Sequence, residues 1–300
     1  MAGTRRETAR DTVRAEFDTA YDEVMARWPD GTESLTVPTL YGPTRVHTCG
    51  PHDAPPLVLL PGGGATSAGW YATAAELSGT HRVFAVDMVG DAGYSTPDPE
   101  RPVRAVSDLT AWLDALLDGL LPAGSPVDLC GHSYGAWIAL HYALHAPARV
   151  RSLVLLDPTG CFAGFRAGYL LRALPLLLRP TAPRYRRFLA WETAGGAPLD
   201  PALLRLQERA AVLPTVRPVT GPRPDPAALR GLRCPVLLLL AGAGRAHDPH
   251  RVAARASGTL PEVAAAVLPG VSHHALPFVM PADVNSRTAA FLGSLSRPSR

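Results

Sequence analysis

The chain has 300 residues, 47% of them apolar and 18% charged, with a formal net charge of +3. Such a length and composition suit one large globular domain, or a domain with an inserted segment, and argue against intrinsic disorder. The small positive charge and the absence of a basic stripe interleaved with aromatic residues argue against a nucleic-acid partner.

No uncharged apolar run approaches the roughly 18 residues of a transmembrane helix. The first residues also lack the apolar core of an export signal. We therefore expect no transmembrane segment and a cytoplasmic protein. The four cysteines, Cys49, Cys130, Cys161 and Cys234, do not have the spacing of metal ligands and are expected to be structural.

The first element expected is a helix between Thr8 and Trp28, because Phe17, Tyr21 and Val24 share one helical face. Residues 1–32 are thus expected to form an N-terminal helix packed on the core. A short hairpin should follow, with strands at residues 33–37 and 44–48 around Gly42-Pro43.

Five continuous apolar runs then predict strands that are buried on both faces. They cover residues 57–60, 83–86, 127–130, 153–156 and 236–240. Because helical segments alternate with them, they predict an α/β fold with a mostly parallel, twisted sheet and helices on both faces. The expected core comprises residues 33–157 and 233–300.

Residues 158–232 interrupt this alternation and predict an inserted helical cap, or lid. Prolines are frequent there, and helices are expected at Tyr169–Leu178 and Leu199–Val212. Between Arg166 and Arg230 the segment carries eleven arginines against four acidic residues. The cap is therefore strongly basic, and the remainder of the chain is slightly acidic.

The most specific motif is Gly-His-Ser-Tyr-Gly at residues 131–135, between the apolar run that ends at Cys130 and a helical segment that starts at Ala136. A serine between two glycines at a strand-to-helix corner is held in a strained turn that exposes its hydroxyl group. Ser133 is therefore the predicted nucleophile.

With this motif the chain resembles the α/β-hydrolase superfamily, and within it bacterial carboxylesterases of the naproxen-esterase type, from Thr36 to Leu295. The resemblance is carried by Leu-Leu-Pro-Gly-Gly-Gly at 59–64, Trp-Tyr at 70–71, Ala-Val-Asp-Met-Val-Gly-Asp at 85–91 with Ser95, the serine motif, and a histidine loop at 270–277. It implies the α/β-hydrolase fold with an oxyanion hole, for which the backbone N–H groups of Gly63 and Tyr134 are the candidates.

The histidine loop offers two candidates for the general base, His273 and His274. The spacing to Pro281 and Asn285 that the resemblance implies favours His274, which leaves His273 where a glycine is usual. Adjacency alone does not tell which of the two rings faces Ser133.

The acid is where the chain departs from the family. Most relatives carry it shortly after the strand at 236–240, but that position is Gly244. Asp157 ends the strand at 153–156, a place that certain haloalkane dehalogenases use, and it is the favoured substitute. Asp248 is the alternative, although an aspartate before Pro249 also suits a helix cap.

These residues predict a serine hydrolase that cleaves carboxylic esters through Ser133, His274 and Asp157, with no metal and no organic cofactor. The substrate would be a small-molecule ester or acyl compound. The side chains expected to contact it are Trp70, His132, Phe162 and Phe165.

Other functions stay open. A thioesterase or acyl-transfer enzyme of a biosynthetic pathway could receive an acidic carrier protein at the basic cap. A non-hydrolytic cyclase or lyase, or a ligand sensor, could use the same fold. The missing acid at Gly244 keeps this alternative open, whereas the intact serine motif and histidine loop argue against it. The apolar run 169–178 could contact a membrane surface, but Pro175 interrupts it and packing over the active site is expected.

Overall fold

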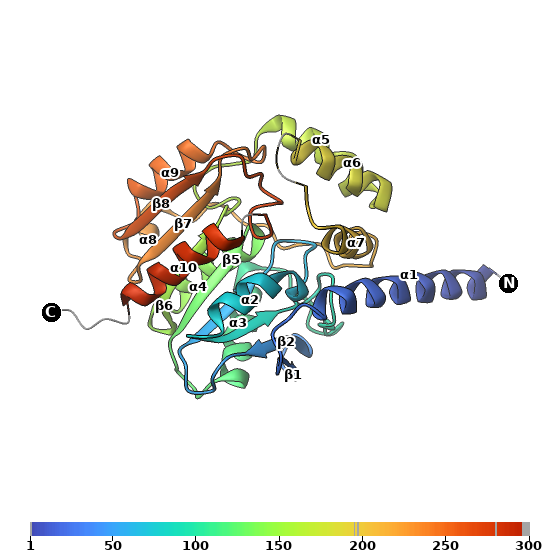
Figure 1. Cartoon of the computed structure of the whole chain (residues 1–300), viewed down its shortest axis with the longest axis horizontal. Helices are drawn as coiled ribbons and strands as arrows, with labels where there is room; N and C mark the ends of the chain where they lie inside the picture. Colours follow the sequence, from blue (N-terminus) through green and yellow to red (C-terminus); the bar gives the residue numbers. More distant parts are fainter. Residues whose placement is uncertain (1, 195, 197, 280, 296–300) are drawn as a thin grey trace.

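A mostly parallel sheet forms the centre of the molecule (Figure 1). The computed structural model describes residues 2–194, 196, 198–279 and 281–295. The strands are β1 Glu33–Val37, β2 Thr44–Cys49, β3 Pro56–Leu60, β4 Arg82–Val86, β5 Val127–His132, β6 Val150–Leu156, β7 Val236–Ala241 and β8 Val263–Leu268. Within the described residues they form one eight-stranded sheet in the order β1-β2-β4-β3-β5-β6-β7-β8. The β1–β2 and β2–β4 pairs are antiparallel, and all later pairs are parallel.

Helices cover both faces of this sheet, as the alternation of apolar runs predicts. The helices of the core are α2 Tyr71–Leu77, α3 Val106–Leu120, α4 Tyr134–His145, α9 Pro249–Ser257 and α10 Pro281–Leu295. Alternate side chains of β3 point to opposite faces of the sheet and join the hydrophobic core on each face. Val58 and Leu60 pack with residues of α3, α4 and α9, whereas Leu57 and Leu59 pack with residues of α2 and α10.

The N-terminal helix α1 spans Ala2–Met25, and the three apolar residues that predict it, Phe17, Tyr21 and Val24, are buried. It packs against the short 3₁₀ helix at Ser67–Trp70 and against helix α7, Pro201–Ala210. The Tyr21 hydroxyl donates to Asp87 Oδ2 at 3.0 Å, which links the helix to the loop that follows β4.

Four helices, but no strand, lie between β6 and β7 in the described residues; we call residues 158–232 the cap segment. The helices are α5 Ala167–Leu178, α6 Ala182–Glu192, α7 Pro201–Ala210 and α8 Pro226–Arg230. The apolar patterns predict α5 and α7, while the arginine-rich α6 and the five-residue α8 were not expected. Figure 1 shows α5, α6 and α7 gathered on one side of the molecule, with α1 beside α7.

The sequence analysis did not predict strand β8. β8 has the sequence Val-Ala-Ala-Ala-Val-Leu and, in the described part of the chain, pairs with β7 alone at the edge of the sheet. Three consecutive alanines at a partly exposed edge give no buried apolar run, so the pattern that predicts the central strands is missing here. Within the described residues, no helix combines the length and apolarity that spanning a bilayer requires.

Candidate active site

The turn between β5 and α4 holds Ser133 in a strained conformation, with φ 52° and ψ −108°. Its two glycines are required by close backbone contacts. A Cβ atom on Gly131 would lie 2.5 Å from the Gly135 carbonyl oxygen, and one on Gly135 would lie 2.3 Å from the Leu60 carbonyl oxygen. The motif therefore brings α4 against the sheet and leaves the Ser133 side chain at the corner.

Ser133 and Asp157 are the only non-glycine residues with positive φ in the described parts of the chain, at 52° and 45°. They follow the neighbouring parallel strands β5 and β6. The Ser133 N–H donates to the Leu156 carbonyl at 2.9 Å, and the Asp157 N–H donates to the Leu239 carbonyl at 2.8 Å. Strained residues of this kind gather at functional sites, because the surrounding structure must hold them in place.

A chain of hydrogen bonds joins three side chains from separate parts of the sequence. Ser133 Oγ lies 2.9 Å from His273 Nε2, and His273 Nδ1 lies 2.6 Å from Asp157 Oδ2. An ionised carboxylate only accepts hydrogen bonds, so Nδ1 carries the proton and the neutral ring accepts from the Ser133 hydroxyl through Nε2. This arrangement can draw a proton from the serine hydroxyl.

The structure corrects the expectation for His274, because the histidine in contact with Ser133 is His273. The two rings lie 5.1 Å apart at 86° to each other, so only one of them points into the gap between Ser133 and Asp157. His274 faces the cap segment instead, with Nε2 3.1 Å from the Tyr169 hydroxyl.

Of the two candidate acids, Asp157 is the one that contacts a histidine of this loop. Its other oxygen, Oδ1, accepts from the Ala241 N–H at 3.1 Å and lies 3.0 Å from His247 Nε2. Asp248 caps α9, where Oδ1 accepts the backbone N–H groups of residues 250 and 251. At Gly244 a Cβ atom would lie 3.0 Å from the Ala241 carbonyl oxygen, so a side chain at the usual acid position would be crowded.

The candidate oxyanion residues lie next to each other. A Cβ atom on Gly63 would be 3.7 Å from Tyr134 Cβ, and Tyr134 is the first residue of α4, where a backbone N–H has no acceptor within the helix. The Gly64 N–H donates to Asp91 Oδ2 at 2.8 Å, which fixes the glycine loop against the loop after β4. Burial raises the pKa of Asp91 to about 6, although the N–H groups of Gly64 and Ala92 favour its charged form.

The four residues expected to contact the substrate do not lie together in the structure. Trp70 and Phe162 are almost fully buried and belong to two different hydrophobic cores. His132 is also buried and donates from Nε2 to the His273 carbonyl at 2.9 Å, which makes it a support of the histidine loop. Phe165 is 42% exposed and stacks on Tyr169 of α5.

Comparisons with known proteins fit this geometry. The model of a family described as the alpha/beta hydrolase family matches residues 57–287. The chain belongs to the alpha/beta hydrolase family. It is 32% identical to an uncharacterized carboxylesterase of Bacillus subtilis (strain 168) in an alignment of 292 residues that covers 93% of each protein.

Solved structures agree with this assignment. The crystal structure of carboxylesterase CesB (YbfK) from Bacillus subtilis is similar with a TM-score of 0.86 and 28% identity, and the match covers 94% of this chain and 99% of that one. Naproxen esterase from Bacillus subtilis gives a TM-score of 0.84 and 30% identity, with 93% of this chain and 97% of that one covered. This protein is a carboxylesterase-like α/β hydrolase.

The electrostatics of this α/β hydrolase keep Asp157 ionised and favour a proton on His273. Burial would raise the pKa of Asp157, but hydrogen bonds from His247 and His273 outweigh it and hold the pKa below its ordinary value. Burial also opposes protonation of His273, yet the hydrogen bond and charge of Asp157, together with the charge of Glu192, raise its pKa. The ring is therefore well suited to accept a proton.

Two buried side chains of the hydrolase site were not anticipated from the sequence. His247 lies in the loop after β7, and Glu192 ends α6 in the cap segment. Glu192 accepts the backbone N–H groups of His273 at 3.0 Å and of His274 at 3.2 Å. The sequence could have pointed to His247, because it is a polar residue in the loop after β7 that carries the acid in most relatives. Glu192 lies far from the histidine loop in the sequence and contacts it only in the folded chain.

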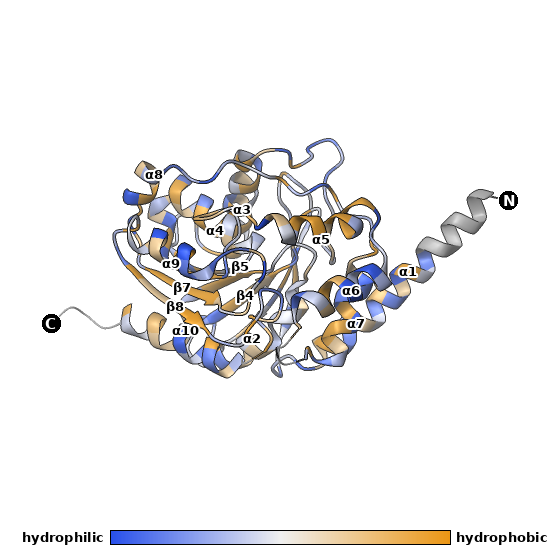
Figure 2. Cartoon of the chain, turned by 90° about the horizontal axis from the view of Figure 1, so that it is seen from above, coloured by the Kyte–Doolittle hydropathy of each residue, from blue (hydrophilic) through white to orange (hydrophobic). Residues whose placement is uncertain are grey.

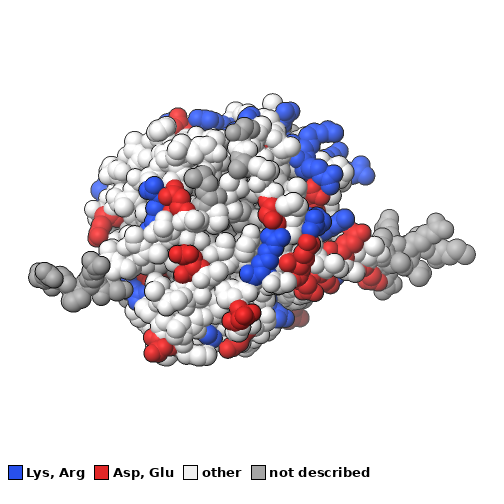
Figure 3. Space-filling model, in the orientation of Figure 1, with Lys and Arg blue, Asp and Glu red and all other residues white. Residues whose placement is uncertain are grey.

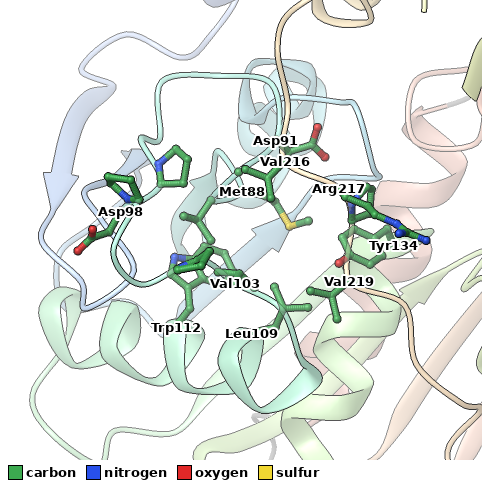
Figure 4. A pocket seen from close by; sticks show the side chains of 16 residues that line it. Met88, Asp91, Asp98, Val103, Leu109, Trp112, Tyr134, Val216, Arg217 and Val219 are labelled. Carbon is green, nitrogen blue, oxygen red and sulfur yellow. The ribbon is translucent and has the colours of Figure 1, made fainter. Parts of the chain in front are cut away.

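A cavity of about 260 Å³ lies beside the serine turn, on the side of Tyr134 (Figure 4). It is lined by the loop after β4, by α3 and by residues 216–219 of the cap segment. Most of its wall is apolar, and Asp91, Asp98 and Arg217 add charged groups. Across the described residues, no group of three or more His, Cys, Asp or Glu side chains is placed to hold a metal ion.

Removing the Glu192 carboxylate should destabilise the hydrolase. Glu192→Ala leaves two buried N–H groups without an acceptor, which should lower the free energy of unfolding by roughly 2 to 5 kcal/mol. Urea denaturation at neutral pH measures the change. As a control, Glu23→Gln removes one charge of the exposed Glu23–Arg205 pair and should cost less than about 1 kcal/mol. Equal effects of the two changes would contradict the role given to Glu192.

Proposed function

We propose that this α/β hydrolase cleaves carboxylic esters, with Ser133 as nucleophile, His273 as general base and Asp157 as the residue that orients the imidazole. The observation that carries the proposal is the hydrogen-bond chain from Ser133 Oγ through the His273 ring to Asp157 Oδ2. The relatives named carboxylesterase and naproxen esterase support an ester as the substrate class.

In the first half-reaction Ser133 Oγ forms a bond to the ester carbonyl carbon while His273 Nε2 takes the hydroxyl proton. The tetrahedral intermediate collapses when the bond to the alkoxy oxygen breaks, and the imidazolium gives its proton to the departing alcohol. Water then attacks the acyl-enzyme by the same route in reverse and releases the carboxylic acid. Asp157 stays ionised throughout and stabilises the imidazolium.

The negative charge that develops on the carbonyl oxygen needs donors that are already in place. We assign this role to the backbone N–H groups of Gly63 and Tyr134. Their proximity and the helix N-terminus at Tyr134 support the assignment. The hydrogen bond from Gly64 to Asp91 limits movement of the glycine loop and so helps to hold the Gly63 N–H in position.

Turnover of p-nitrophenyl esters with acyl chains of increasing length tests the proposal. p-Nitrophenol is a good leaving group, so acylation should be faster than hydrolysis of the acyl-enzyme, and we expect a burst of p-nitrophenol followed by steady release. A fluorophosphonate should inactivate the protein at one equivalent, and peptide mass spectrometry should find the adduct on Ser133. As a control, Ser286, an exposed serine of α10, should stay unmodified.

A protein that binds these esters without releasing p-nitrophenol, and that resists the fluorophosphonate, would contradict the proposal and favour a ligand sensor. Turnover of a matched thioester series alone would instead favour the thioesterase alternative. Either result leaves the fold unchanged, because fold and chemistry are separate properties.

A further inference from the structure

Helix α5 is apolar on two faces, and only one of them is covered. Its inner face, with Tyr169 and Ala173 buried and Leu176 partly buried, packs against Phe188 and Trp191 of α6. The outer face contacts no other part of the described chain closely enough to bury it. Its leucines remain exposed by the following fractions: Leu170 47%, Leu171 73%, Leu174 45%, Leu177 70% and Leu178 76%.

The spacing of these five leucines places them on one stripe of the helix, which we call the leucine stripe. Phe165, just before the helix, is also 42% exposed and stacks on Tyr169 of the inner face. Of the eight large hydrophobic side chains that are exposed in the described residues, six belong to residues 165–178. Single exposed leucines are ordinary on a protein surface, but a contiguous group of this kind marks an interaction site. Figure 2 shows α5 as a largely hydrophobic helix.

Arginines lie at both ends of the leucine stripe, because Arg166 directly precedes α5 and Arg179 directly follows it. Residues 165–192 contain six of them, Arg166, Arg172, Arg179, Arg184, Arg186 and Arg187, against one acidic residue, Glu192. Glu192 is buried and faces the histidine loop, so it does not reduce the positive charge at the surface. Among the described residues, ion pairs engage only Arg166 and Arg186 of the six. Figure 3 shows the resulting basic cluster in the area where Figure 1 places α5 and α6.

We propose that the leucine stripe and its arginines dock this protein on the surface of an anionic phospholipid membrane. Apolar side chains that enter the acyl region, bordered by basic side chains that meet the phosphates, are the features of helices that lie in a membrane interface. Guanidinium groups suit this border because they bind phosphate in a bidentate manner.

The charge distribution argues against the other occupants. A second copy of the chain would bring two sets of arginines together across the stripe, and like charges repel. An acidic carrier protein would satisfy the arginines but leave five leucines facing a polar partner. An anionic membrane would take up the leucines in its acyl region and pair the arginines with its phosphates.

Docking through this face would bring the proposed active site close to the membrane. The Tyr169 hydroxyl, on the inner face of α5, lies 3.1 Å from His274 Nε2, and the Tyr169 ring lies 6.5 Å from the His273 ring. Esters dissolved in the lipid would thus meet the hydrolase where they are most concentrated. This last step rests on the proposed ester hydrolysis, whereas membrane docking does not.

Sedimentation of the full-length protein with vesicles tests the docking. Vesicles of phosphatidylcholine mixed with phosphatidylglycerol should retain at least about tenfold more protein than vesicles of phosphatidylcholine alone, and high salt should reduce the difference. The double variant Leu171→Asp/Leu178→Asp should lose binding to the mixed vesicles by at least about tenfold. Leu40→Asp, at an exposed leucine far from α5 in the sequence, should bind like the parent protein.

Three results would overturn the docking proposal: no binding of the parent protein to the mixed vesicles at low salt, equal binding of the double variant, or a dimer in solution that the double variant dissociates. Release of p-nitrophenol from a water-soluble ester is measured separately. Vesicle binding without ester turnover would overturn the proposed function alone, and turnover without vesicle binding would overturn the docking alone.

Discussion

Replacing His273 by alanine is expected to lower kcat for a p-nitrophenyl ester on the order of 10⁶-fold, the scale of losing the general base of a serine triad. The reason is geometric, because the His273 ring is the one that bridges Ser133 Oγ and Asp157 Oδ2. Steady-state kinetics of the purified variant, with folding checked by circular dichroism, measures the effect.

The neighbouring histidine provides the matched control. His274→Phe removes the hydrogen bond to the Tyr169 hydroxyl but keeps an aromatic ring next to Phe188, so kcat should fall less than about tenfold. An active His273→Ala together with an inactive His274→Phe would reverse our assignment and restore the one that the sequence favours.

Asp157→Asn should lower kcat about 10⁴-fold, as expected when the imidazole loses the partner that fixes its tautomer. The asparagine keeps the size of the side chain, so the loss would come from proton placement and charge. Two histidines contact this carboxylate, His273 through Oδ2 and His247 through Oδ1. The same kinetic assay, run over a pH series, measures both the loss and its pH dependence.

The pH profile adds a second readout with a defined sign. Catalysis needs neutral His273, whose pKa is raised in the parent protein, so kcat/KM should decline as the pH falls through a value above about 6.5. Asp157 contributes to that raised pKa. In Asp157→Asn the remaining activity should therefore persist to lower pH than in the parent protein.

Asp248→Asn is the control for the second acid candidate. Asparagine caps a helix about as well as aspartate, so this variant should keep both stability and activity. Should Asp248→Asn lose activity while Asp157→Asn keeps it, the acid would have to be reassigned to Asp248.

The sequence allows most of the sheet and the serine turn to be predicted, because both depend on local patterns. Buried parallel strands appear as apolar runs, and the two glycines around Ser133 are needed by contacts within the turn and with the end of β3. Asp157 could be proposed because it ends one of these runs. The edge strand β8 and the arginine-rich helix α6 lack such patterns, and the sequence analysis missed both.

The choice between His273 and His274 could not be made from the sequence, because it depends on how a loop turns at two consecutive residues. Residues outside the loop hold that turn in its conformation. Glu192 accepts both backbone N–H groups, and His132 donates to the His273 carbonyl. These partners are more than 80 residues away in the chain, so no local pattern reports them.

The contact of Glu192 with the histidine loop also limits how the cap segment can move. Lifting α6 away would expose a carboxylate and strip two N–H groups of their acceptor, while the Asp157-Pro158 junction ties the start of the segment to the strained end of β6. α5 is tied to the same region, because its Tyr169 hydroxyl lies 3.1 Å from His274 Nε2 and its inner face packs on Phe188 of α6. Movement that admits a substrate should therefore leave the C-terminal end of α6, and the inner face of α5 that packs on it, in place against the histidine loop.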